Sequence, residues 1–165
     1  MEHEYTDAEI LNHEAGHLLV AYVLSERLGL SNMYRRVFYC RKRNEAYLEP
    51  NFADGQWEHD SSLAILHCAV LLGGTVADEI AGTIDGGQNW KDMSEFQTVT
   101  ASQETFGDCE ARFRSMVFII LTGDLVSKAM ATFVEEMLMR LNAEDSEGVA
   151  FFSWDEVPSL FTSEG

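Results

Sequence analysis

A long segment near the N-terminus limits the fold more than any other part of the chain, because it carries the signals of a helix start, a helix body and a helix end. Thr6 and Glu9 have the spacing of a capping box, in which each side chain accepts a backbone N–H of the first turn. Apolar residues follow at helical spacing: Leu11, Leu18, Leu19, Tyr22 and Val23. Gly29 is a typical stop. We therefore predict a helix over residues 7–28.

The rest of the chain predicts further helices around one strand-like interval. Helices are expected over residues 61–82, 92–106, 109–121 and 124–141. Ser153 and Glu156 form a second capping box before a short terminal helix. Residues 33–48 favour strands, and Asn44-Glu45 could turn a short hairpin. We expect residues 1–165 to form a single domain that is mainly α, with one short β-hairpin.

The charge balance argues against several classes of partner. The 165 residues include 28 acidic and 11 basic side chains, which give a formal net charge of −17. Sequence-independent binding to nucleic acid depends on Lys and Arg, so this chain should repel phosphate backbones and anionic membrane surfaces. The same excess of negative charge favours solubility and can attract basic segments. We therefore expect neither nucleic acid nor a membrane as a partner.

Cysteine usage and the apolar runs predict a soluble, cytoplasmic protein. The three cysteines, Cys40, Cys68 and Cys109, have no close pairing and are expected to be reduced thiols. Residues 1–4 are acidic and polar, so they do not resemble a secretory signal. The longest apolar runs, residues 63–72 and 116–121, fall short of the roughly 18 residues that indicate a membrane span.

Nearly half of the basic residues lie within the strand-like interval: Arg35, Arg36, Arg41, Lys42 and Arg43. One interpretation is an exposed edge strand whose charges discourage aggregation. The other is an edge that pairs with an extended peptide by strand addition. Both interpretations place this strand at the border of a sheet.

The chemically informative motif is His13-Glu14-Ala15-Gly16-His17, which lies within the first predicted helix. Residues four apart share one helix face, so His13 and His17 can direct imidazole nitrogens to one zinc ion. Glu14 would emerge beside an attacking water, where it can act as general base and then pass the proton to a leaving amine. The alternative without a metal site is two histidines on the helix surface beside an ordinary glutamate.

A catalytic zinc site takes three protein ligands and leaves one position open, so a third ligand is needed from elsewhere in the chain. Residue chemistry alone leaves five candidates open: Asp78, Glu79, Asp85, Asp92 and Glu95.

Three segments together resemble the peptidase domain of the FtsH-type membrane AAA+ proteases. They are residues 13–20 (HEAGHLLV), 72–80 (LGGTVADEI) and 86–92 (GGQNWKD), and the resemblance covers roughly residues 6–97. It implies a zincin-like helical metallopeptidase with His13, His17 and Asp92 as zinc ligands and Asp85 as the reserve for the third. It also implies a homo-oligomer, because peptidase domains of this family assemble as hexamers.

The glycine pair Gly73-Gly74 has a packing explanation in this setting. A helix without side chains there can approach the zinc-binding helix closely, near Ala15 and Gly16. Glu79 would then accept the outer N–H of one ligand histidine, or else face solvent at a helix end. His67 is expected to be a core histidine with hydrogen-bond partners, while His3 and His59 are expected at the surface.

Three functions remain open from the sequence. The first is a zinc-dependent metallopeptidase in which Glu14 activates water to hydrolyse unfolded or flexible polypeptides lying along residues 35–43. The second is a zinc-binding adaptor with little or no activity. It is favoured by Trp90 and Lys91, which stand between Asn89 and Asp92, and by the absence of an ATPase motor from this chain. The third is a helical scaffold that binds no metal.

Overall fold

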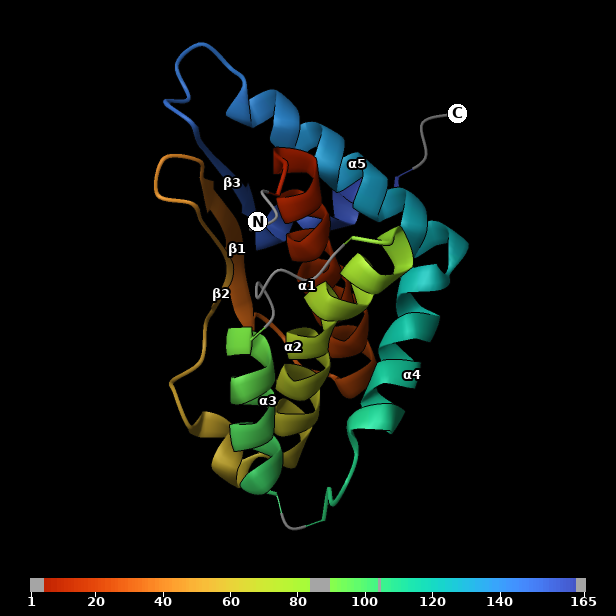
Figure 1. The fold of residues 1–165 in the computed structure, drawn as a ribbon. Coiled ribbons are helices and arrows are strands. Elements are labelled where there is room, and N and C mark those ends of the chain that lie inside the picture. Colours follow the sequence, from red (N-terminus) through yellow and green to blue (C-terminus); the bar gives the residue numbers. More distant parts are fainter. Residues whose placement is uncertain (1–4, 84–89, 104, 163–165) are drawn as a thin grey trace, which may run out of the picture.

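The computed structural model describes residues 5–83, 90–103 and 105–162, which form a mainly helical fold with one antiparallel sheet (Figure 1). The helices are α1 (Asp7–Leu28), α2 (Ser61–Ala81), α3 (Trp90–Ala101), α4 (Glu110–Thr122) and α5 (Asp124–Leu141), with 3₁₀ helices η1 (Gln56–His59) and η2 (Trp154–Phe161). The strands are β1 (Tyr34–Cys40), β2 (Glu45–Pro50) and β3 (Val149–Ser153). The predicted helical class is confirmed.

Helix α1 has the predicted boundaries because its ends are fixed by local chemistry. The Thr6 hydroxyl accepts the Glu9 N–H at 3.1 Å, and the Glu9 carboxylate accepts the Thr6 N–H at 3.0 Å. Gly29 ends the helix with a φ of 69°, which favours glycine. Helix α1 packs against α2 and α5, and its middle turns are buried on most sides.

Helix α2 is the core helix of the fold. The Asp60 carboxylate accepts the Leu63 N–H at 3.1 Å at its start, and Gly82 ends it with a φ of 75°. By length and composition alone α2 could cross a membrane, but 83% of its most apolar window is buried inside the fold. Such burial is usual for the central helix of a soluble protein.

The sheet has the order β2-β1-β3, so the prediction of a single hairpin is incomplete. Strands β1 and β2 form the expected hairpin, and β3 pairs with the other side of β1, from Arg36↔Ser153 to Cys40↔Val149. The arginine-rich strand β1 is therefore central, and the prediction that it forms an edge is wrong. β3 has only five residues after an acidic linker, and its partner is distant in sequence, so local patterning did not identify it.

The C-terminal helices agree with the sequence except for α3, which begins at Trp90, two residues earlier than predicted, and also ends early. α5 has the predicted boundaries, α4 is shifted by one residue, and the Ser153–Glu156 capping box precedes η2. Helix α3 ends at Ala101 instead of residue 106. There the Ser102 hydroxyl donates to the Val99 carbonyl at 2.6 Å, and the Gln103 amide donates to the Trp57 carbonyl at 3.1 Å. These side-chain bonds compete with continuation of the helix.

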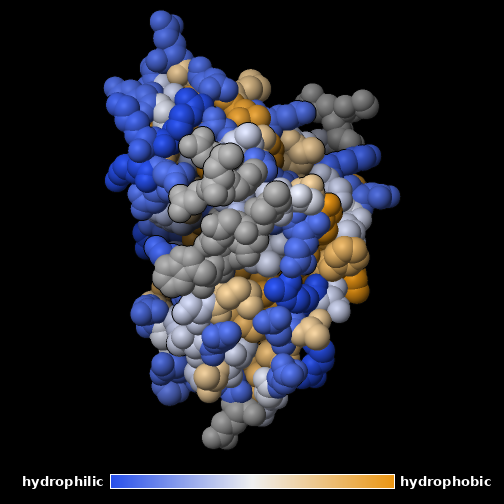
Figure 2. All heavy atoms as spheres, in the orientation of Figure 1, coloured by the Kyte–Doolittle hydropathy of each residue, from blue (hydrophilic) through white to orange (hydrophobic). Residues whose placement is uncertain are grey.

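The face of the molecule that looks over α3 is mostly hydrophilic, with hydrophobic side chains at the edge near the α4–α5 corner (Figure 2). Phe118, Ile119 and Leu125 on these helices are more than half exposed. The predicted free thiols Cys40, Cys68 and Cys109 are all buried.

Candidate metal centre

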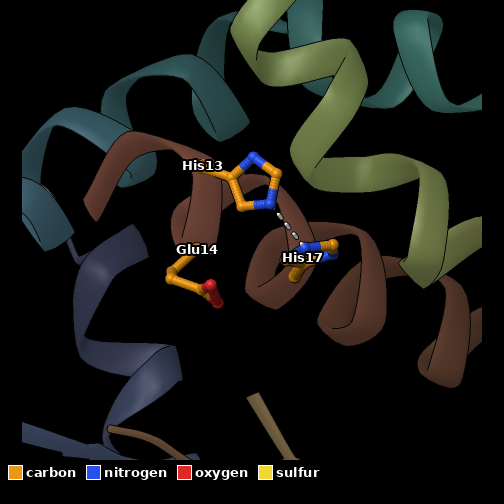
Figure 3. Close-up of side chains that lie close together, drawn as sticks. All are labelled: His13, Glu14 and His17. Atoms are coloured by element: carbon orange, nitrogen blue, oxygen red, sulfur yellow. Dashed lines mark hydrogen bonds between the residues drawn. The ribbon is translucent and has the colours of Figure 1, made fainter. Parts of the chain in front are cut away.

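Three potential metal ligands from two helices meet beside α1. His13 and His17 extend from α1, and their Nε2 atoms are 3.1 Å apart; Figure 3 shows these nitrogens directed toward one another. Asp92, in the first turn of α3, brings Oδ2 to 3.4 Å from His13 Nε2 and 3.2 Å from His17 Nε2. All three side chains are at least three-quarters buried.

The hydrogen bonds of the two Nδ1 atoms determine whether each Nε2 atom can bind a metal ion. His13 Nδ1 donates to Asp78 Oδ2 at 2.8 Å, and His17 Nδ1 donates to the Val70 carbonyl. A carboxylate or carbonyl oxygen only accepts, so the hydrogen of each neutral ring lies on Nδ1. Each Nε2 then presents a lone pair. When both rings are neutral, two lone pairs and the Asp92 carboxylate therefore converge without a hydrogen to share, an arrangement that either protons on the rings or a metal cation stabilises.

The spacing of these acceptor atoms fits zinc. Four ligand atoms at about 2.0–2.1 Å from a tetrahedral zinc lie about 3.3 Å from one another. The three distances among His13 Nε2, His17 Nε2 and Asp92 Oδ2 run from 3.1 to 3.4 Å. Two imidazoles and a carboxylate are also a common donor set for zinc that carries out hydrolysis. The residues present thus fit the ion that the sequence predicts.

Glu14 lies next to this group, and the described residues offer no hydrogen-bond partner to its Oε2 atom. It extends from α1 on the same side as His13 and His17 (Figure 3), and a carboxylate oxygen lies within 4.8 Å of a nitrogen of each ring. The side chain is buried, and Oε2 makes no hydrogen bond within the described structure. Asp92 approaches the two nitrogens more closely, so Asp92 has the position of a ligand and Glu14 that of a neighbouring base.

The electrostatics of the group are those of a site that requires positive charge. Burial lowers the pKa of His13, but hydrogen bonds to Asp78 and Asp92 outweigh burial and raise it to about 10. His17 shows the same balance, in which burial is outweighed by the charge of Asp92 and the pKa is raised. Burial raises the pKa of Asp92, but the His17 charge and hydrogen bonds to both rings bring it well below its usual range.

The pKa of Glu14 moves in the opposite direction to that of Asp92. Burial raises it, and the charges of His17 and His13 only partly offset the effect. A carboxylate with a raised pKa is a better proton acceptor than an ordinary surface glutamate.

Close packing between α1 and α2 depends on glycine, as predicted from Gly73-Gly74. A Cβ at Gly73 would lie 2.6 Å from the Gly16 carbonyl oxygen, in contact with the α1 backbone. A Cβ at Gly74 would lie 2.6 Å from His17 Nε2 and even closer to the His13 ring. Neither distance is sterically tolerable, so Gly74 leaves the space that the two rings occupy.

The expected partner of the ligand histidines is one residue away from the predicted one. Asp78 is 3% exposed and holds His13, whereas Glu79 has a side chain that is 59% exposed and pairs with Arg114 at 2.7 Å. Of the two alternatives predicted for Glu79, contact with a ligand histidine is wrong and exposure at a helix end is confirmed. Successive helix residues point about 100° apart, so a shift of one position exchanges the buried face for the solvent. The apolar pattern of α2 was the sequence signal that could have placed Asp78 on the buried face.

Among the described residues, the remaining candidates for a third ligand are engaged with other partners. Asp78 is engaged with the outer nitrogen of His13, and Glu95 faces His67 at 3.2 Å. Asp85 lies outside the described residues. Trp90 and Lys91 do not prevent Asp92 from reaching the histidines, because α3 already begins at Trp90.

The metal centre opens into a cleft of about 1000 Å³ between the helices and strand β2. The residues of β2 that line it include Ala46, Leu48 and Pro50. β2 is the outer strand that borders this cleft, whereas β1 is paired on both sides. The predicted substrate path along residues 35–43 is therefore wrong for β1, whose Arg36 instead pairs with Glu49 at 2.9 Å.

The other histidines show one departure from expectation. His59 is exposed, as predicted, and His3 lies outside the described residues. His67 has partners at both ring nitrogens, Tyr34 at 3.4 Å and Glu95 at 3.2 Å, yet it lines the same cleft as the metal centre.

Comparison with known proteins does not extend this description: no family model matches the chain, and no curated protein matches it significantly.

Proposed function

We propose that the protein is a zinc-dependent metallopeptidase that hydrolyses peptide bonds in unfolded or flexible polypeptides. The observation that carries the proposal is the convergence of His13, His17 and Asp92 at distances that suit zinc, beside the buried Glu14. Zinc, when bound, would polarise the scissile carbonyl and make an attacking water more acidic.

The chain's own residues have separate tasks in this reaction. Asp78 and the Val70 carbonyl orient the two imidazoles, so that their lone pairs face the ion. Glu14 accepts a proton from the attacking water as the new C–O bond forms, and it then donates that proton to the amine as the C–N bond breaks. Its raised pKa favours the first transfer, and its buried position beside the metal centre keeps it near the amine for the second.

The cleft supports a polypeptide substrate in extended form. Strand β2 borders the cleft, and its outer edge can offer backbone hydrogen bonds to an added strand. An unfolded segment or flexible tail meets this requirement without prior unfolding. We thus replace the path along β1 with one along β2.

We extend the proposal to family and location. The helical fold with a cleft between a helix pair and a small sheet is what a zincin-like, FtsH-type peptidase domain would require, and a homo-oligomer belongs to the same proposal. Buried free thiols at Cys40, Cys68 and Cys109 favour a reducing, cytoplasmic compartment.

The test is the substitution Glu14→Gln, assayed with denatured casein and with metal analysis of the purified protein. We expect one zinc per chain in both proteins. The wild type should cleave casein at least 100-fold faster than the variant. Glu135→Gln, an exposed residue of α5, is the control with the same charge change. Cleavage must also stop with a chelator. Zinc without cleavage in the wild type would instead indicate a binding adaptor, and a metal-free protein a scaffold.

A further inference from the structure

A second polar group lies in the same cleft at a distance from the metal centre. His67 is 7% exposed, and its ring stacks on Trp57 and meets Phe52 edge-on, each with centroids 5.2 Å apart. Its Nε2 faces Glu95 Oε1 at 3.2 Å. With Asp54, which also lines the cleft, we call these residues the His67 subsite.

The helices set the separation between the two groups. His67 precedes Gly74 by about two turns of α2, and Glu95 follows Asp92 by about one turn of α3. At 1.5 Å per residue these intervals are about 10 and 5 Å. An extended peptide advances about 3.3 Å per residue. The His67 subsite therefore lies one to three substrate residues from the bond that the metal centre would cut.

The walls of the His67 subsite combine aromatic surface with exposed carboxylate. Phe52 is half-buried and lines the cleft, so its ring offers surface on which a long aliphatic stem can pack, while the buried Trp57 supports the His67 ring. The Glu95 side chain is 44% exposed, so its carboxylate can accept further hydrogen bonds while it holds His67. This combination suits the methylene chain and charged end of Lys or Arg.

The charge around the cleft favours the same ligand. Five acidic residues line it: Glu14, Glu45, Asp54, Asp92 and Glu95. Among the described lining residues, Lys91 is the one Lys or Arg. A divalent ion at the metal centre would offset Asp92 and Glu14, but it would leave the other three carboxylates to attract cations.

We propose that the His67 subsite binds a Lys or Arg side chain of the polypeptide substrate, one to three residues from the scissile bond. This inference rests on the proposed peptidase function and specifies its substrate class as basic segments. Glu95 determines the specificity, and it contacts the substrate cation directly.

The first experiment maps cleavage of a library of randomised, end-blocked peptides by mass spectrometry. With the zinc-loaded wild type we expect Lys or Arg about tenfold more often than Asp or Glu at one of the three positions on one side of the cut. Glu95→Gln preserves an acceptor for His67 and should reduce the preference to twofold or less. Glu95→Lys should reverse it, and Glu135→Gln should leave it unchanged. Cleavage without a basic preference would overturn the proposal.

A second experiment needs no catalysis, so it separates failure of the His67 subsite from failure of the peptidase. Fluorescence anisotropy at 0.15 M salt would follow a fluorescein-labelled hexapeptide of alternating Arg and Ala, and its counterpart with norleucine in place of Arg. We expect the Arg peptide to bind about tenfold more tightly, an advantage that Glu95→Gln loses and Glu135→Gln retains. If these binding results are obtained and no hydrolysis is seen, the His67 subsite is supported and the peptidase function is not. Equal losses in both variants mean general charge attraction and refute the subsite.

Discussion

The metal centre and the His67 subsite both include a carboxylate of α3 and both contact α2, yet they are built differently. At the metal centre the inward face is buried, Asp78 and Val70 fix both rings, and glycine brings the backbones into contact. At the His67 subsite the carboxylates of Glu95 and Asp54 face solvent. Bond breaking requires atoms held in place, whereas recognition of a long flexible side chain tolerates movement. Substitutions at the metal centre should therefore change stability and metal binding more than substitutions at the His67 subsite do.

The largest effect is expected for Gly74→Ala, because the new methyl group would overlap the rings of His13 and His17. We predict loss of stoichiometric zinc and a fall of about 3 kcal/mol in the free energy of unfolding beyond that caused by the lost metal. Metal analysis and urea denaturation measure the two. Gly123→Ala is the control, since its Cβ would lie 3.5 Å from the nearest atom, an ordinary contact. Wild-type zinc content in Gly74→Ala would contradict the packing described for α1 and α2.

Removal of the metal should come next in size. A ligand at 1000 times its dissociation constant stabilises a fold by about 4 kcal/mol, so a chelator should lower the melting temperature by about 10 °C. Differential scanning calorimetry with and without zinc gives the shift. Asp92→Asn should show a much smaller shift in melting temperature, because the substitution removes a carboxylate of the metal centre. Glu95→Gln should show the same chelator-induced shift in melting temperature as the wild type. A smaller shift in this variant would mean that Glu95 contributes to metal binding and that the metal centre and the His67 subsite are not separate.

Asp78→Asn should have an intermediate effect, since it weakens the hydrogen bond that orients His13. Partners of this kind change metal affinity by about 10- to 100-fold. Competition with a fluorescent zinc indicator measures the dissociation constant. Glu79→Gln, one residue along but paired with Arg114, should change it less than twofold. A larger effect at Glu79 than at Asp78 would contradict the assignment of Asp78 as the residue that orients His13.

The smallest effect is expected at the solvent-facing region. Lys91→Ala removes positive charge from the cleft rim, so the Arg-containing hexapeptide should bind about twofold more tightly. Zinc affinity and melting temperature should stay within error of the wild type. Weaker binding of that peptide would show that Lys91 has a role other than repulsion of cations.

Local signals predicted much of the fold and part of the metal centre. The capping box at Thr6 and the stop at Gly29 delimit α1 correctly, because each acts within one helical turn. The spacing of His13 and His17 similarly brings their nitrogens together on one helix face. Gly73 and Gly74 marked a close helix contact, since glycine in a helix interior needs such a reason.

Features that depend on distant parts of the chain were harder to predict. β3 acquires its strand character through pairing with β1, more than a hundred residues earlier in the sequence. The choice of Asp78 over Glu79 depends on the rotation of α2 against α1, and residue type does not reveal it. Nor does sequence alone show that β1 is central, because strand order is a property of the assembled sheet.

Asp92 reaches the two histidines from a helix that follows them by more than seventy residues. An ion held by all three would act as a cross-link between remote points of the chain, comparable in its entropic effect to a disulfide that closes a long loop. Zinc supply would then govern how long the folded chain survives in the cell as well as its chemistry. A shortage of the metal would leave α3 held by weaker contacts, such as its packing against α2 and the Phe96–Phe113 ring contact, and expose the polypeptide to other proteases.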